Sequence, residues 1–352
     1  MTQVDAKLVE VIAPNFKRRL SGVTSTIVRL VPLQAQQITI ATAGSGLPAE
    51  LPHLSVLQLL TMSRNGPQGA RVWHARRNVE MLGGLLLKVL LRKNLKLLFT
   101  SASQRKHTGY TKWLISKMDQ VIATSAKGAK YLEVPAQVVH HGINTRDFTP
   151  TADKPALRRK LGLPEEAILV GCYGRIRAQK GTDVFVDAML EILKNHPKAV
   201  GVVMGRATEK HVDFARDLRA RVAAAGMQDR LLFPPEVPVW EVAQWYQALD
   251  LYVAPQRWEG FGLTPLEAMS CGVPVVATRV GAFEELIAPD ITGKLIDPGE
   301  VSQMIEAIDA VLTPEGRLSA WSVASRQRVE EQFAIEREAE TLIAIYRELL
   351  NN

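Results

Sequence analysis

Two glutamates, Glu259 and Glu267, stand eight positions apart and are joined by a glycine-rich stretch that leads into a helical segment and then an apolar strand. This spacing predicts one carboxylate in a loop and the other about one turn into the helix, where both can face one ligand. The first N–H groups of a helix suit a phosphate or a sugar oxygen. A structural role is the alternative, because a glutamate in a first helical turn interacts favourably with the helix dipole.

Two cations occupy a second loop of the same kind. Arg175 and Lys180 follow an apolar run at 169–173 and precede a helical segment at 182–194. Ligands of open α/β sheets bind at the carboxyl ends of the strands. Two cations beside a helix N-terminus would hold a diphosphate, although solvated loop charge is the alternative explanation.

The elements that must position these loops alternate between β and α along the whole chain. Short apolar runs at 8–13, 37–42, 96–100 and 120–123, and again at 167–173, 199–204, 230–233, 251–254, 274–278 and 293–296, are separated by longer helical segments. Continuous apolar strands of this kind are buried on both faces, as in parallel sheets covered by helices. We therefore expect an α/β protein with two Rossmann-like, doubly wound domains at 1–148 and 167–334. A proline-containing linker at 149–166 joins them, and an amphipathic helix within 335–352 ends the chain.

Charge is distributed unevenly between the two halves. The net charge of +7 divides into +13 for residues 1–148, with 20 Lys+Arg against 7 Asp+Glu, and −6 for the remainder. A strongly basic half indicates a binding partner with an anionic surface, either membrane lipid or nucleic acid. The histidine or aromatic clusters typical of nucleic-acid-binding proteins are missing, so we expect an anionic membrane as the partner and no nucleic acid.

The cysteines and the hydropathy of the chain indicate the cellular compartment. Cys172 and Cys271 lie in apolar segments, and we expect two small buried side chains rather than a disulfide or a metal pair. No signal peptide precedes the first strand, and no apolar run is long enough to span a bilayer. A cytoplasmic protein, peripheral on the inner face of the cytoplasmic membrane, is expected.

The combined motifs closely resemble those of the retaining glycosyltransferases of family four. They are Gly174-Arg175 with Lys180-Gly181, the loop 255–262 with Glu267-Ala268-Met269, the segment 272–278, Gly281-Ala282-Phe283-Glu284-Glu285 and Thr292-Gly293. A weaker similarity lies in the first half, in Thr124-Ser125, at 141–144 and at Phe148. The resemblance covers the second half of the chain. It implies a GT-B architecture, in which two facing Rossmann-like domains enclose a deep cleft and a C-terminal helix returns to the first domain.

The resemblance also implies roles for individual residues. Arg175 and Lys180 would hold the donor diphosphate and stabilise the leaving group, Glu259 would contact the transferred sugar, and Glu267 would bind the ribose. Sugar and phosphate oxygens would bind the amides of Gly260, Phe261, Gly262 and Leu263. No metal is required, because cations and a helix dipole can stabilise the charge that develops on the phosphate.

The first half of the chain also contains candidate site residues. His107 resembles the family's first-domain histidine and would lie across the cleft from Glu259, although a lone histidine is often a surface or capping residue. Arg105 and Lys106 beside it suit an anionic acceptor or are solvated charge. The family's Gly-Gly pair is reduced here to Gly22, within 18–24. In the second half, Arg206 follows the strand at 199–204 and is a candidate phosphate ligand.

A segment at 82–96 reads as a helix that is apolar around most of its circumference, with Lys88, Arg92 and Lys96 at four-residue spacing. Such a basic stripe can lie on anionic headgroups. Packing against the first sheet explains the pattern equally well, so both interpretations stay open at this point.

These observations favour a metal-independent hexosyltransferase that uses a nucleotide sugar as co-substrate and a lipid-linked saccharide as acceptor. The chain looks most like bacterial lipopolysaccharide-core mannosyltransferases, which implies GDP-mannose as the donor. Alternatives are a UDP-sugar donor with another glycolipid or polysaccharide acceptor, a GT-B epimerase or phosphorylase, and a non-catalytic scaffold. A dinucleotide-dependent dehydrogenase is disfavoured because no Gly-x-Gly-x-x-Gly follows either opening strand.

Overall fold

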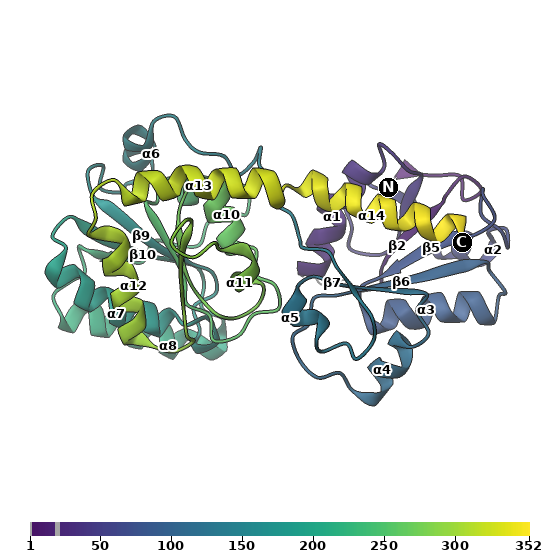
Figure 1. The fold of residues 1–352 in the computed structure, drawn as a ribbon, viewed down its shortest axis with the longest axis horizontal. Helices are drawn as coiled ribbons and strands as arrows, with labels where there is room; N and C mark the ends of the chain where they lie inside the picture. The colour runs from purple at the N-terminus through teal and green to yellow at the C-terminus, as the bar shows by residue number, and fades with distance from the viewer. Residues whose placement is uncertain (1, 18–21) are drawn as a thin grey trace. The chain divides into compact units, whose positions relative to one another are not determined.

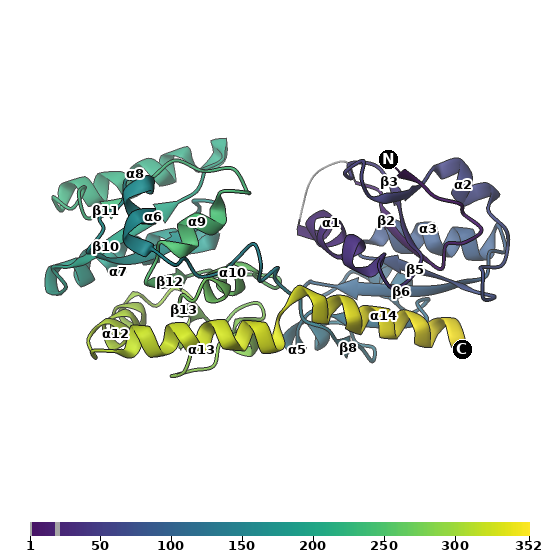
Figure 2. The same ribbon diagram turned by 90° about the horizontal axis from the view of Figure 1, so that it is seen from above.

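The chain forms two compact α/β units (Figures 1 and 2). A computed structural model describes residues 2–17 and 22–352. Unit 1 comprises Met1–Gly142 together with Ile335–Asn352, and unit 2 comprises Ile143–Ala334. The final segment therefore belongs with the first unit, as the sequence predicts.

Unit 1 is built on an eight-stranded sheet in which every strand pair is parallel, with the order β1-β4-β3-β2-β5-β6-β7-β8. The strands are β1 Thr2–Gln3, β2 Val11–Asn15, β3 Ile40–Gly44, β4 Pro52–Leu54, β5 Arg71–Ala75, β6 Leu95–Ser101, β7 Gln120–Ala123 and β8 Gln137–Val138. Strands β2 and β3 begin three residues later than the apolar runs predicted, since those runs start in the preceding loops.

Helices cover both faces of this sheet. One buried cluster joins α1 Gly22–Gln34 and α14 Ile335–Asn351 to the sheet through Leu30, Leu342 and Val72. The opposite face carries α2 Val56–Thr61, α3 Asn78–Val89 and α4 Gly109–Ile115. The short α5 Ala126–Ala129 follows β7.

The central strand β5 was not predicted, because it opens with a charged residue. Arg71 is nevertheless fully buried. Its guanidinium donates to the carbonyl oxygens of Val9, Ser63 and Ala6 at 3.0 to 3.1 Å. Buried cations persist where their donors are satisfied in this way.

The predicted helix at 82–96 is wrong in its extent. Helix α3 ends at Val89, Arg92 has a positive φ of 51°, and Lys96 lies in β6. The three cations therefore do not form one helical stripe. The helix packs on β5 through Gly84, where an added Cβ would come within 2.5 Å of the Trp73 ring, while Leu86 on its other side is exposed.

Unit 2 contains a six-stranded parallel sheet in the order β11-β10-β9-β12-β13-β14. Its strands are β9 Ile168–Tyr173, β10 Ala199–Met204, β11 Leu231–Leu232, β12 Leu251–Ala254, β13 Val275–Thr278 and β14 Gly293–Ile296. Its helices are α6 Lys154–Leu161, η1 Ala178–Lys180, α7 Thr182–Asn195, η2 Glu209–His211, α8 Val212–Ala224, α9 Val242–Gln247, α10 Thr264–Ser270, α11 Phe283–Leu286, α12 Val301–Leu312 and α13 Arg317–Gln332. The sheet is buried on both faces between two apolar clusters.

The division between the units falls six residues earlier than the predicted end of the first domain, at Gly142. Residues 149–166 are part of unit 2 rather than a separate linker. Helix α6 carries the buried Arg158, which pairs with Asp250 at 2.5 Å and donates to the Ala248 carbonyl. These bonds fix the segment against the second sheet.

In the described part of the chain, no helix is both long and apolar enough to cross a membrane. The two cysteines are free and buried, as expected. Burial raises the pKa of the Cys172 thiol to about 12, so this thiol remains protonated and unreactive at neutral pH.

Candidate active site

Two loops at the carboxyl edge of the unit 2 sheet are joined to each other. The first follows β9, the second follows β12, and these strands are neighbours in the sheet. Arg257 N donates to Gln179 O at 3.0 Å. Gly181 has φ +69°, and a Cβ there would lie 1.8 Å from the Pro255 carbonyl oxygen. Only glycine permits this approach, which brings the predicted cation loop against the predicted carboxylate loop.

An ion pair reinforces this contact. Arg257 Nη1 and Nη2 lie 2.7 and 2.8 Å from the two oxygens of Asp183, in the first turn of α7, and Nη1 also donates to the Ala178 carbonyl. The hydrogen bonds that Arg257 donates to Asp183 raise the pKa of Arg257. Arg257 thus holds both the short helix that ends at Lys180 and the start of α7.

Lys180 and Glu259 form the closest contact between the loops, with 2.5 Å from Nζ to Oε2. Their side chains are 22% and 21% exposed, so a ligand can reach the pair without unfolding of either loop. The other oxygen of Glu259 accepts from Gly260 N at 3.0 Å. Gly262, with φ +90°, leaves room for the Glu259 stem, since a Cβ would lie 2.9 Å from its Cγ.

Glu267 lies on the fourth residue of α10, about one turn into the helix as predicted. Its Oε2 accepts from Tyr246 Oη at 2.9 Å. Burial, followed by the charge of Glu267, raises the pKa of Tyr246, which keeps the phenol protonated as a donor. The two glutamates therefore have different partners: Glu259 faces a cation and Glu267 faces a buried phenol.

The remaining predicted cations of unit 2 are exposed. Arg175 makes no hydrogen bond or ion pair with any residue that the structure describes, which leaves its guanidinium open to a ligand. Arg206 lies beside the same loop through its backbone, where its carbonyl accepts from Ile176 N at 3.2 Å. Its side chain is 74% exposed and lies 3.5 Å from Glu236.

In unit 1, His107 lies in the loop between β6 and α4. Its Nε2 is buried and has no hydrogen-bond partner among the described residues. Burial lowers the pKa of His107, and Arg105 and Lys112 lower it further. A neutral imidazole with an unsatisfied nitrogen can accept or donate one hydrogen bond to a ligand. Arg105 and Lys106 are exposed beside it.

Gly22 is the first residue of α1, and residues 18–21 of the predicted glycine loop lie outside the described residues. Beside α1, Arg77 donates to Asn15 Oδ1 at 2.7 Å, to Thr24 Oγ1 at 3.0 Å and to Glu80 Oε1 at 2.7 Å. This cluster links the carboxyl ends of β2 and β5. Sequence reasoning missed it, although Glu80 is the only acidic residue in 55–118.

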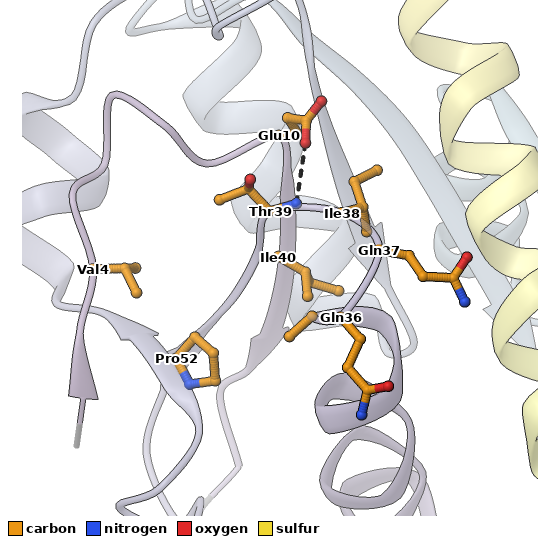
Figure 3. Close-up of a pocket in the computed structure, with 9 residues that line it drawn as sticks. Val4, Glu10, Gln36, Gln37, Ile38, Thr39, Ile40 and Pro52 are labelled. Carbon is orange, nitrogen blue, oxygen red and sulfur yellow. Dashed lines mark hydrogen bonds between the residues drawn. The ribbon is translucent and has the colours of Figure 1, made fainter.

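A pocket in unit 1 is lined by none of the candidate residues of that unit. Figure 3 shows Glu10, Gln36, Thr39 and Pro52 among its lining residues, where Glu10 accepts from Thr39 N at 3.0 Å. It is at the amino ends of β3 and β4, the edge opposite to the one that binds ligands in open α/β sheets. Among the described residues, no group of three or more His, Cys, Asp or Glu could hold a metal ion.

Comparison with known proteins identifies the family. The profile described as "Glycosyl transferases group 1" matches residues 153–328. Over 99% of this chain and 99% of each relative, the identity is 52% to the lipopolysaccharide core biosynthesis mannosyltransferase LpsB of Rhizobium meliloti (strain 1021) and 50% to LpcC of Rhizobium leguminosarum bv. viciae. The chain belongs to the group 1 glycosyltransferases.

Solved structures agree with this assignment. Anabaena Alr3699/HepE, solved with UDP, matches with a TM-score of 0.82 over 97% of this chain and 100% of that chain, at 16% identity. The C-terminal domain of LpcC from Francisella tularensis matches 55% of this chain and 100% of its own length, at 31% identity and a TM-score of 0.53. These likenesses confirm the predicted GT-B fold. The profile match and the two full-length relatives confirm the resemblance to glycosyltransferases. This glycosyltransferase is an enzyme whose predicted donor residues in unit 2 lie at one edge of one sheet.

Proposed function

We propose that this glycosyltransferase transfers mannose from GDP-mannose to a lipid-linked saccharide of the lipopolysaccharide core, with retention at the anomeric carbon. The observation that carries the proposal is the identity of 52% and 50%, across 99% of the chain, to two proteins named as lipopolysaccharide core mannosyltransferases. Full-length identity at this level includes the first unit, to which we assign the acceptor.

The arrangement in unit 2 supports a nucleoside diphosphate as the leaving group. During transfer the bond between the anomeric carbon and the β-phosphate oxygen breaks, and its electron pair passes to the phosphate. Arg175, exposed and unpaired among the described residues, and Lys180 would stabilise that charge. No step in this scheme requires a metal ion.

The carboxylate of Glu259 would stabilise the positive charge that develops on the sugar ring. The acceptor hydroxyl would attack from the face that the diphosphate leaves, and its proton would pass to the departing phosphate oxygen. We assign Glu267 to the ribose and the amides of 260–263 to sugar and phosphate oxygens. His107, with its unpartnered Nε2, would hydrogen-bond the sugar.

The acceptor is lipid-linked in this proposal, so the enzyme would work at the cytoplasmic face of the cytoplasmic membrane. The balance of 20 Lys+Arg against 7 Asp+Glu in residues 1–148 supports attraction to an anionic surface. Arg105 and Lys106 are the candidate contacts for acidic groups of the acceptor.

A thermal-shift panel of GDP, UDP, ADP and their sugars tests the donor. We expect GDP-mannose to raise the Tm more than any UDP-sugar, while preference for UDP would overturn the assignment of GDP. Transfer from labelled GDP-mannose to lipopolysaccharide that lacks core mannose tests the reaction. The anomeric configuration of the product, read by NMR, tests retention, and epimerised free donor would instead indicate an epimerase.

A further inference from the structure

Exposed apolar side chains concentrate on one side of unit 1. In the described residues, ten of the eighteen exposed large hydrophobic side chains lie on α2, on α4, or on α3 and the two residues that follow it: Val56, Leu57, Leu60, Val79, Leu86, Val89, Leu90, Leu91, Tyr110 and Trp113. We name these ten residues the α2–α3–α4 face. Single exposed apolar residues are ordinary, but a group of this size on one layer marks an interaction surface.

The three helices form one layer. Leu59 of α2, Leu87 of α3 and Leu114 of α4 belong to the same buried cluster beneath them. The segments that follow α2 and α3 are joined, because Asn94 N donates to the Arg64 carbonyl at 2.9 Å. Figure 1 shows α3 and α4 on the side of the sheet away from α14.

The outward residues of this layer are more exposed than packing on a neighbouring helix would leave them. Leu57 and Leu90 are each 69% exposed, and Val89 is 61% exposed. Tyr110 and Trp113 stack at 6.2 Å between ring centroids and are 51% and 47% exposed. Aromatic side chains of this kind are favoured where one end is apolar and the other is wet.

The charge around the face has one sign. Residues 55–118 contain 12 Lys+Arg and a single acidic residue, Glu80, which is fully buried. Two of the cations pair with acids from later segments, Lys88 with Asp119 and Lys112 with Glu133. Exposed cations in this stretch are Arg64, Arg92, Arg105, Lys106 and Lys117.

We propose that the α2–α3–α4 face binds a bilayer that contains anionic lipid. Its leucines, valines and aromatic rings would enter the boundary between headgroups and acyl chains, and the surrounding cations would meet lipid phosphates. A second copy that presents the same face fits less well, because its own cations would face these cations. The biological membrane rests on the proposed function, but the surface itself stands on exposure and charge.

Vesicle sedimentation tests the surface, with phosphatidylcholine vesicles that contain or lack phosphatidylglycerol. The triple variant Leu57→Gln, Leu90→Gln, Trp113→Gln should weaken partition by about tenfold or more, since each side chain loses its apolar burial. The matched control Val212→Gln, Ile291→Gln, Val323→Gln removes exposed apolar residues of unit 2 and should change partition by less than about twofold.

The cations are tested separately. Arg92→Gln with Lys117→Gln should weaken binding to anionic vesicles by about fivefold per charge and leave binding to neutral vesicles unchanged. Lys198→Gln with Lys210→Gln, two exposed cations of unit 2, is the control. High salt should remove the difference between the two vesicle types and retain the apolar contribution.

Wild-type binding that equals that of the triple variant, or no wild-type binding at all, would overturn the proposal. Concentration-dependent oligomers that the triple variant abolishes, without vesicle binding, would assign the face to a second copy instead. Thermal melts of each variant identify loss through unfolding, and Leu90→Gln alone then replaces the triple variant. Vesicle binding without mannose transfer would contradict only the proposed function. Transfer to a soluble acceptor without vesicle binding would contradict only the proposal that the α2–α3–α4 face binds a membrane.

Discussion

Replacing Glu259 by glutamine should separate nucleotide binding from sugar transfer. In the structure Lys180 Nζ lies 2.5 Å from Glu259 Oε2, and both side chains are about four-fifths buried, at 22% and 21% exposure. A diphosphate that binds Lys180 must compete with this carboxylate and also approach its negative charge. Glutamine keeps the shape and a hydrogen-bond acceptor but removes the charge.

The expected change in nucleotide affinity follows from the loss of the contact between Lys180 and Glu259. A hydrogen bond to a charged group contributes about 1.5 to 3 kcal/mol, and the amide retains part of it. Relief of the competition should therefore contribute about 1 to 2 kcal/mol, which is about 5- to 30-fold tighter binding of free GDP. Transfer should fall by about 100-fold or more, since the charge opposite the developing cation is gone.

Calorimetry with the free nucleoside diphosphate and single-turnover transfer measure the two effects on the same protein. Glu191→Gln is the matched control, because Glu191 pairs with Lys194 at 2.7 Å in α7 with both side chains more than half exposed. It should change neither quantity. Weaker GDP binding by Glu259→Gln would refute the competition, and undiminished transfer would refute the role of the carboxylate.

Four further substitutions, one of them combined with a pH titration, extend these tests. Gly181→Ala and Gly226→Ala both place alanine at φ near +70°, but only the first would put Cβ 1.8 Å from the Pro255 carbonyl oxygen. Denaturant unfolding should show a loss of about 1 kcal/mol for Gly226→Ala, and a loss several times larger, with impaired donor binding, for Gly181→Ala. Asp183→Asn should raise the donor KM about fivefold with little change in Tm, because Arg257 loses its ionic partner. An unchanged KM would show that Arg257 does not position Lys180 for the donor. Burial lowers the pKa of His74 well below its ordinary value, so the native state resists a proton that the unfolded chain accepts. The unfolding free energy should fall as pH drops below about 6.5, by up to about 1.4 kcal/mol per pH unit for this group, and His74→Asn should flatten the slope.

Local patterns in the sequence were sufficient for the architecture and for placing the candidate donor residues of unit 2 in loops that follow strands. Parallel strands buried on both faces are continuous apolar runs, so β7, β12 and β14 lie where those runs predict them. Strand β5 was not predicted because it begins with Arg71, a charged residue. Arg71 is buried because it donates hydrogen bonds to three backbone carbonyls, and a pattern of apolar residues does not reveal such bonds. The predicted extent of α3 was wrong because Leu90 and Leu91 continue the apolar run after the helix has ended at Val89.

The chain by itself determined which residue types stand in each loop, because strand, turn and helix signals are local. Only the tertiary structure decided which loops meet. Lys180 and Glu259 are 79 positions apart, and Asp183 and Arg257 are 74 apart. Their contacts exist because β9 and β12 are neighbours in the sheet although two strands, β10 and β11, intervene in the sequence. Strand order depends on how whole faces pack, so the partner of each charged side chain is a property of the folded sheet.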